Sequence, residues 1–393
     1  IYYEPHSLGA DLDPDSLVVT ADRDFGSLPA GTDLGPLFLA GTSQAVLKVT
    51  GNLRLRPGSV TVTARICDIL GNQSEPYTYS FVVAAQGQAV EPFSQPDLWC
   101  LRFDRDWWTF ESTCDGSRVE ITTTFQPNGR ADFIDDLILL GLYNEEAPEV
   151  SQWVAELVKE RVLVNLREFY YIAEDGSHNE DSPEIEFSLD SSHCASAIAI
   201  GGADPAGGYT LGRAYFDWGN QNREDDTAPA LGVFSTNLIR FYINTSYSFQ
   251  ELFDPFIPCR GNPVGTLAID STVMSDSFEP GAEGNSEEEE QRYQDLFNAV
   301  DAFGRAIAAI LAHEIGHSVG LVANGPPPGG LFGGETNAEF TGYWTDPYHI
   351  DTLGNNIMEA AMSFTVMQYR GSEALRFNEL NTAYLRERIL LEK

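Results

Sequence analysis

One long helix near the C-terminal end limits what this chain can fold into more than any other feature. From about Glu288 to Val322 the apolar residues recur every three or four positions, which predicts a helix with one buried face. The acidic run Glu287–Glu290 is typical of a solvated helix start, because the positive end of the helix dipole favours negative charge. The predicted buried face consists of Tyr293, Leu296, Phe297, Val300, Phe303, Ile307, Ile310 and Leu311.

A second helix and a mostly extended middle complete the pattern. Apolar residues from Val150 to Phe169 follow the same helical rhythm and predict a helix that packs on a sheet. One long helix, an extended stretch and a second long helix together predict α+β layers. The β-like runs are Leu98–Trp108, Arg118–Phe125, Ile185–Leu189, Ala197–Ile200, Gly212–Trp218 and Leu238–Ile243.

The N-terminal part of the chain has a different pattern. Short β-like runs with turn residues between them predict a small all-β sandwich over residues 1–86. Residues 87–96 contain Gln and Pro and predict a linker, which leaves residues 97–393 as the second unit. The segment Ile66–Pro76 and the strand after it resemble the last hairpin of bacterial immunoglobulin-like modules. That resemblance implies a spacer role, favoured over a pro-segment or a substrate-binding role.

The chain is strongly acidic. Its 59 acidic and 23 basic residues give a formal net charge of -36 over 393 residues. Such a charge repels phosphate backbones and anionic lipid headgroups, which argues against a nucleic-acid partner. No segment approaches 18 uninterrupted apolar residues, so no membrane insertion is expected. The chain begins at Ile1 without a signal-like stretch, and we expect a processed part of a longer precursor or of a larger surface protein.

Five cysteines point to disulfides and not to a metal site. They show no CxxC or CxxH spacing, which argues against cysteine-bound zinc. Disulfides would suit a secreted or cell-surface protein, and we expect a bacterial one. Cys100 with Cys114 and Cys194 with Cys259 are plausible pairs that leave Cys67 free, although spacing alone does not determine the connectivity.

The end of the long helix carries the pattern His313-Glu314-Ile-Gly-His317. Residues four apart lie about 5 to 6 Å apart on one helix face, so both imidazoles can reach one ion. Glu314 stands beside the first histidine, where its carboxylate can meet a water on that ion without being a ligand. With six histidines in 393 residues, roughly 0.01 occurrences of the pattern are expected by chance. The pattern predicts a catalytic zinc site, in preference to a structural one or to two packed histidines.

With Gly320 the motif becomes His-Glu-x-x-His-x-x-Gly, which resembles the signature of the metzincin zinc peptidases. The resemblance implies a metzincin-like α+β fold in which the glycine turns the chain and a third His or Asp ligand follows three residues later. In this chain that position is Ala323, which cannot bind zinc. Catalytic zinc needs three protein ligands and one open position, so a third ligand is expected from another segment.

His349 is the preferred third zinc ligand. It is the only histidine after His317, and it precedes Asn355–Met358, which resembles the methionine turn of metzincins. Asp351 is the next candidate. The other histidines, His6, His178 and His193, are expected to have no such role. Glutamates that would give a thermolysin-like arrangement instead are Glu335, Glu339 and Glu359.

Two further features of the metzincin resemblance have candidates in this chain. Met358 is preferred for the methionine turn over Met362 and over Met367, which stands in a Met-x-Tyr pattern similar to that of some metzincins. If Met367 forms the turn, Tyr369 is a candidate fifth ligand or oxyanion stabiliser, although a core aromatic is favoured. The run Gly212–Trp218 resembles the edge strand that binds the substrate backbone in metzincins.

These features predict a zinc-dependent peptidase that hydrolyses peptide bonds of protein substrates. Zn²⁺ on His313, His317 and His349 would activate a water, with Glu314 as the general base. The alternative is a non-catalytic surface or adhesive module with a vestigial or structural zinc site, and a third possibility is an enzyme kept latent by residues 1–86 or by Cys67. The acidic loop Pro127–Asp136 could hold Ca²⁺, but it lacks the alternating ligands of an EF-hand, which favours a solvated turn.

Overall fold

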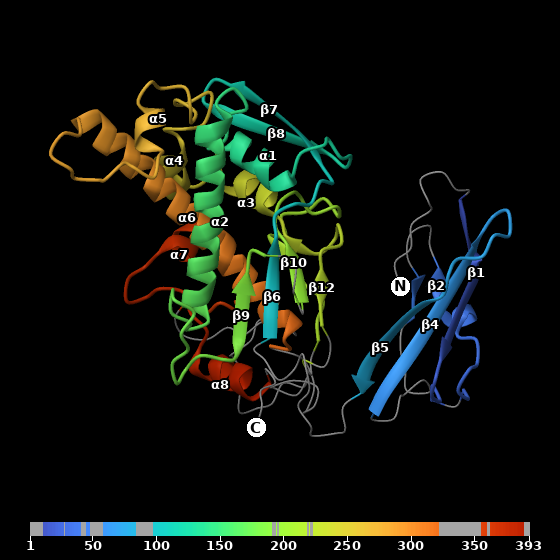
Figure 1. Cartoon of the computed structure of the whole chain (residues 1–393). Coiled ribbons are helices and arrows are strands. Elements are labelled where there is room, and N and C mark those ends of the chain that lie inside the picture. Colours follow the sequence, from blue (N-terminus) through green and yellow to red (C-terminus); the bar gives the residue numbers. More distant parts are fainter. Residues whose placement is uncertain are drawn as a thin grey trace. The chain divides into compact units, whose positions relative to one another are not determined.

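The computed structural model divides the chain into two compact units, residues 1–91 and 92–392 (Figure 1). The boundary falls inside the segment 87–96 that was expected to be a linker. Each unit is described below by itself. The structure describes residues 11–26, 28–40, 45–47, 58–83, 97–190, 194, 196–217, 220, 223–321, 355–359 and 362–388.

The smaller unit is built around an antiparallel sheet with the order β1-β4-β5. Alternate residues of β4, from Val60 to Ile66, point into a small core together with Leu17 and Val19 of β1. This alternation is the pattern of a strand with one buried face. The elements of this unit are β1 (Leu12–Ala21), the 3-10 helix η1 (Gly35–Leu37), β2 (Leu39–Ala40), β3 (Ala45–Val46), β4 (Gly58–Asp68) and β5 (Tyr77–Val83).

The larger unit contains a parallel sheet with the order β12-β10-β6-β9. A short antiparallel ribbon of β11 and β13 adjoins this sheet, because Val233 of β13 bridges Ile200 just after β10. A separate hairpin is formed by β7 and β8. The strands are β6 (Asp97–Arg102), β7 (Thr109–Asp115), β8 (Arg118–Thr124), β9 (Ile185–Ser188), β10 (Ser196–Ala199), β11 (Gly212–Arg213), β12 (Asp225–Asp226) and β13 (Gly232–Val233).

Two long helices, α2 and α6, pack along each other beside the sheet (Figure 1). Both agree with the helices expected from the apolar rhythm. Within the described residues, α6 is also apolar enough, by length and composition, to cross a membrane, but its apolar window is 83% buried in the protein, as in a core helix. The helices are α1 (Asp132–Leu139), α2 (Pro148–Phe169), α3 (Ser235–Tyr242), α4 (Tyr247–Phe253), α5 (Asp270–Val273), α6 (Glu287–Ser318), α7 (Phe364–Gln368) and α8 (Glu379–Arg388).

Helix α6 has well-defined ends. Ser286 and Glu289 form a capping box at its start, so two otherwise unpaired N–H groups are satisfied. At its end Gly320 has a φ of 93°, and Leu321 N–H donates to the Gly316 carbonyl at 2.7 Å. Such a 6→1 bond with a left-handed glycine is a Schellman motif. The helix therefore ends at Ser318, earlier than the expected Val322, and the chain turns at Gly320.

Buried polar contacts fix α6 against its neighbours. The Arg305 guanidinium donates to Asn165 and Glu168 of α2, each at 2.9 Å. Close to the histidine pair, the Tyr170 hydroxyl donates to the Ala312 carbonyl at 3.2 Å. A buried arginine that lost such partners would cost several kcal/mol. The end of α6 is therefore a rigid platform.

Two runs that were expected to be strands need correction. Leu238–Ile243 lies mostly in helix α3, because Leu238, Ile239 and Tyr242 bury one helical face against the core. A short apolar run fits a strand and a buried helix equally well. In the described part of the run Gly212–Trp218, residues 212–217, the strand covers only Gly212–Arg213, and the Tyr215 N–H donates to a carboxylate and not to a neighbouring strand.

The acidic loop Pro127–Asp136 is not a simple solvated turn. From Asp132 onward it is helix α1, and the side chains of Asp132, Asp135 and Asp136 are buried. Backbone N–H groups of Trp107 and Trp108 donate to Asp132 at 3.1 and 3.0 Å. Protein donors therefore bind carboxylates that were considered for calcium.

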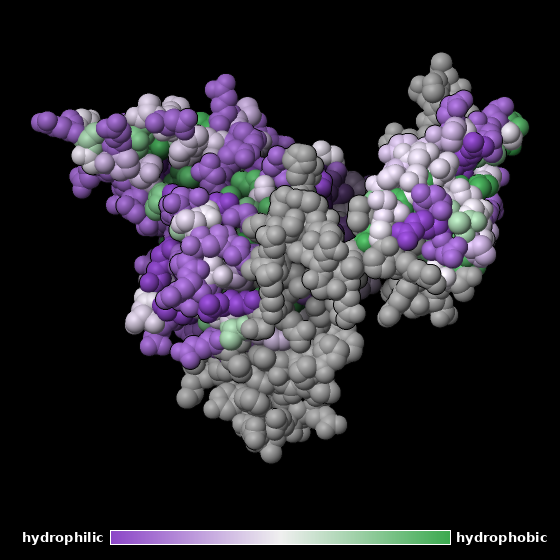
Figure 2. Space-filling view, turned by 60° about the horizontal axis from the view of Figure 1, so that its bottom comes forward, coloured by the Kyte–Doolittle hydropathy of each residue, from purple (hydrophilic) through white to green (hydrophobic). Residues whose placement is uncertain are grey.

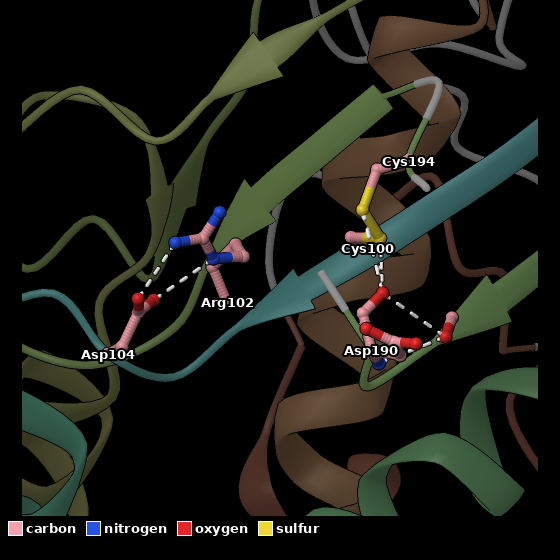
Figure 3. Close-up of a disulfide and its surroundings, with 6 residues drawn as sticks. Cys100, Arg102, Asp104, Asp190 and Cys194 are labelled. Atoms are coloured by element: carbon pink, nitrogen blue, oxygen red, sulfur yellow. Dashed lines mark hydrogen bonds and ion pairs between the residues drawn. A yellow bond between two sulfur atoms is a disulfide. The ribbon is translucent and has the colours of Figure 1, made fainter. Parts of the chain in front are cut away.

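Two disulfides join distant parts of the larger unit, and the expected pairing was wrong. Cys100 pairs with Cys194, with 5.5 Å between the Cα atoms, and Cys114 pairs with Cys259, with 6.2 Å. Figure 3 shows the first pair, where the chain entering β10 lies beside β6. Parallel pairing of these strands brings Cys194 next to Cys100, which linear spacing cannot reveal. Cys67 is free, as expected, and two disulfides favour an oxidising environment.

Candidate active site

The two motif histidines face one point at the end of α6. The Nε2 atoms of His313 and His317 are 3.1 Å apart, and the two ring planes are nearly perpendicular at 86°. This arrangement follows from the four-residue spacing, which places both side chains on one face of the helix. The rings do not point into separate apolar pockets.

A backbone carbonyl determines which nitrogen of His313 carries the proton. His313 Nδ1 lies 2.6 Å from the carbonyl oxygen of Ile357. A carbonyl oxygen can only accept, so Nδ1 must donate and the lone pair of the neutral ring lies on Nε2. Ligating histidines usually have such an outer hydrogen bond, which orients the ring.

The segment that carries Ile357 also lies beneath the helix. A Cβ added at Gly316 would lie 2.7 Å from Met358 Sδ, so the Met358 side chain packs against the turn between the two histidines. Met358 is fully buried. Met367 is also buried, but it belongs to α7, and Tyr369 just after that helix is 44% exposed. Met358, the preferred methionine candidate, is thus in contact with the histidine turn.

Glu314 lies between α6 and β11. Its side chain is 6% exposed, and a Cβ added at Gly212 would lie 2.5 Å from Glu314 Oε1. Only a residue without a side chain leaves room for the carboxylate at this point. Gly212 pairs with Val233 of the antiparallel strand β13. Strand β13 therefore helps to position the β11 backbone, which forms one wall of the narrow slot between α6 and β11 that holds the Glu314 side chain.

The surroundings of Glu314 are negatively charged. Burial raises the pKa of Glu314 to about 8; Asp226 adds to this rise, and the Arg213 guanidinium opposes it. Burial likewise raises the pKa of Asp226 to about 6 and that of Glu224 to about 7. A cation bound at the imidazoles would act in the opposite direction and favour the ionised carboxylates.

An open cleft of about 1080 Å³ borders the histidine pair. Its walls are mainly aromatic and aliphatic, and they come from β11, α3, α6 and the segment after Met358. The cleft is large enough for several residues of a bound peptide. Its lining residues are Tyr209, Thr210, Leu211, Gly212, Arg213, Ala214, Phe216, Phe241, Tyr242, Ile310, His313, Glu314, His317, Glu359, Met362 and Ser363.

Of the other predicted zinc ligands, the structure describes only Glu359. His349, Asp351, Glu335 and Glu339 lie outside the described residues. Glu359 lines the cleft, but within the described part of the chain no three His, Cys, Asp or Glu side chains form a metal-binding group. The described residues therefore bring together His313, His317 and Glu314 of the predicted site.

Three contributions to the site were not expected from the sequence. Gly212 was noted only as part of a strand, the Ile357 carbonyl is a backbone atom, and Asp226 is one of 59 acidic residues. Asp226 accepts hydrogen bonds from the Tyr215 N–H at 2.9 Å and the Ser318 hydroxyl at 2.6 Å. No local pattern identifies such residues, because their partners are far apart along the chain.

No family model, curated protein or solved structure matches this chain. The function must therefore be argued from the chemistry of the site.

Proposed function

We propose that the larger unit is a zinc-dependent peptidase with His313 and His317 as zinc ligands and Glu314 as the general base. The observation that carries the proposal is the 3.1 Å separation of the two Nε2 atoms. Two nitrogens bound tetrahedrally to one zinc at about 2.05 Å are separated by about 3.3 Å. The rings are thus already close to the geometry that a shared ion requires.

A metal-free explanation of the same distance exists, because 3.1 Å also fits an N–H···N hydrogen bond. In that form His317 Nε2 would donate to the lone pair of His313 Nε2. Both forms need the same His313 tautomer, fixed by the Ile357 carbonyl. For zinc to bind, the proton on His317 Nε2 must leave that nitrogen, to Nδ1 of the same ring if the ring is neutral or to solvent if it is an imidazolium. Zinc content decides between the two forms.

Each side chain would have a separate role. A bound Zn²⁺ supplies a Lewis acid that acidifies water and polarises the substrate carbonyl. The imidazoles hold that ion, and the Ile357 carbonyl keeps the His313 ring oriented. Glu314 takes a proton from the attacking water and passes it to the leaving amine, which is a general base followed by a general acid step.

The open cleft favours a catalytic site over a structural one. Structural zinc sites are closed by four protein ligands, whereas catalytic sites keep a position for water and substrate. Here a cleft of about 1080 Å³ reaches both imidazoles and Glu314. A purely structural ion would need no such access.

We extend the proposal to the fold and the location of the protein. Helix α6 with its Gly320 turn, Met358 beneath it, and α2 beside a parallel sheet support a metzincin-like unit. The antiparallel sheet of the smaller unit supports an immunoglobulin-like spacer. Two disulfides support a secreted or cell-surface protein, which we propose to be bacterial.

The proposal is tested by Glu314→Gln. Digestion of a peptide library, followed by mass spectrometry, should show cleavage by the native protein and its loss with a chelator. Glu314→Gln should keep stoichiometric zinc and lose roughly 10²- to 10⁴-fold in kcat. Glu288→Gln, an exposed change at the other end of α6, is the matched control and should cleave normally.

Two outcomes would reject the proposal. Native-like cleavage by Glu314→Gln would exclude it as the base, and bound zinc without any cleavage would favour the non-catalytic module. The same zinc measurement addresses the third ligand, for which we propose His349. Replacing His349 by Ala should release the zinc, whereas Asp351→Ala should retain it.

A further inference from the structure

A buried carboxylate connects the two walls of the slot that holds Glu314. Asp226, at the end of β12, is fully buried, and each of its oxygens accepts one hydrogen bond. Oδ1 accepts from the Tyr215 N–H at 2.9 Å, and Oδ2 accepts from the Ser318 hydroxyl at 2.6 Å. Both donors are neutral, so these bonds offset the cost of burying the carboxylate.

The two donors belong to the two walls. Tyr215 follows Gly212 by three residues on the segment that borders the Glu314 carboxylate. Ser318 is the last residue of α6, one turn beyond Glu314. Asp226 therefore links the two walls. It contacts Ser318 on α6 and Tyr215 on the segment after β11, and Gly212 of β11 contacts Glu314, which is again on α6.

The position of Asp226 itself is determined by the sheet. It pairs with Ile198 of β10, which lies next to β6 in the centre of the parallel sheet. The carboxylate is thus carried by the edge strand β12, which pairs with the parallel sheet through β10. The hydrogen bonds that Asp226 accepts from Ser318 and Tyr215 therefore fix the distance between α6 and the segment that follows β11.

We propose that Asp226 is a positioning residue, which acts through Ser318 and Tyr215 to hold Glu314 in its reactive orientation. The inference rests on the proposed peptidase function. Because Glu314 acts in the chemical step, a loosened slot should lower kcat and leave KM and zinc content nearly unchanged. Outer residues that orient a metal site typically contribute 10- to 100-fold.

The test uses Ser318→Ala and Asp226→Ala in the full chain. Each variant breaks the bridge, because alanine has neither the hydroxyl of Ser318 nor the two accepting oxygens of Asp226. Each should lose roughly 10-fold or more in kcat with full zinc. The double variant should lose little more than either single one, since both changes remove the same connection.

Ser235→Ala is the matched control. The Ser235 hydroxyl also donates to a buried carboxylate, that of Asp136, but neither residue lines the cleft. It should lower the melting temperature as Ser318→Ala does and keep native kcat. Ser318→Thr restores the hydroxyl and should recover kcat.

The possible failures are distinguishable. Native kcat in both bridge variants would overturn the positioning role while leaving the peptidase intact. An equal loss of kcat in Ser235→Ala would show that the effect is general destabilisation and would overturn it as well. A native protein that binds zinc but cleaves nothing would overturn both the inference and the proposed function.

Discussion

The slot around Glu314 gives a sharp steric prediction for Gly212→Ala. An added Cβ would lie 2.5 Å from Oε1, 2.6 Å from Cγ and 2.8 Å from Cδ of Glu314. Ordinary contacts begin at 3.4 Å, so the carboxylate must be displaced by about 1 Å. The φ angle of Gly212 is not in the left-handed region, so alanine introduces no backbone strain.

The size of the effect follows from that displacement. Misplacing a catalytic group by about 1 Å can cost about 10²-fold, which corresponds to about 2.7 kcal/mol in the activation barrier. Overpacking should cost about 1 to 3 kcal/mol in folding, or about 2 to 5 °C in the melting temperature of a unit this size. A loss of about 10²-fold in kcat should therefore accompany a melting temperature lowered by only a few degrees.

The assay compares kcat and KM on a peptide identified by the library digest, together with zinc content and melting temperature. Gly208→Ala is the matched control on the same segment, because its Cβ would meet nothing closer than Thr210 Oγ1 at 3.7 Å. A zinc-loaded Gly212→Ala with the same kcat as Gly208→Ala would refute the reasoning. It would mean that Glu314 either moves freely or has no part in the reaction.

Two further predictions concern stability. The Cys114–Cys259 disulfide closes a loop of 145 residues, so replacing both cysteines by serine should lower the free energy of unfolding by about 5 kcal/mol, or the melting temperature by about 8 °C. Peptide mapping that found the pairs Cys100–Cys114 and Cys194–Cys259 would contradict the connectivity. Burial raises the pKa of Asp136 to about 8, although hydrogen bonds from Ser235 and Thr236 oppose the rise. The folded state then binds the proton more tightly than the unfolded state, so this stability is complete below about pH 4 and is lost as the pH rises toward 8. Urea unfolding at pH 5 and pH 8 should differ by on the order of 4 kcal/mol in the native protein and by less in Asp136→Asn, and a native protein more stable at pH 8 would show that the sign is wrong.

The long helices could be predicted because their signals are local. Apolar residues at a helical spacing are enough to locate α2 and α6, and the motif spacing puts His313 and His317 on one face. The turn at Gly320 was implied by the metzincin resemblance, and its positive φ agrees with it. Such features depend on residues a few positions apart, so the sequence contains nearly all the information they need.

Other features depend on which strands become neighbours. The pairing of Cys100 with Cys194 follows from β10 lying beside β6, and the strand order cannot be read from the spacing of cysteines. Asp226 lies 92 residues from Ser318 in the sequence, and Tyr215 offers only its backbone N–H. A glycine in a strand and an aspartate in an acidic chain are also too common to attract notice.

The acidic side chains of this chain also determine the electrostatics of the candidate active site. Figure 2 shows hydrophilic residues over much of the described surface, as expected for a chain with a net charge of -36. At the end of α6, however, Glu314 and Asp226 are buried, and the pKa of each is raised. His317 also lies in the last turn of a helix of 32 residues, where the negative end of the dipole favours positive charge, and His313 lies one turn before it.

Under the proposal of a zinc site, this field would favour a cation at the histidine pair over a neutral, metal-free pair. Negative potential from the helix end and from nearby carboxylates stabilises any cation at the Nε2 atoms, whether a proton or a metal ion. A proton would satisfy one lone pair, whereas a divalent cation would use both and would also lower the pKa of Glu314 toward its ordinary range. The electrostatics of the slot and the 3.1 Å spacing of the imidazoles therefore support the same occupant.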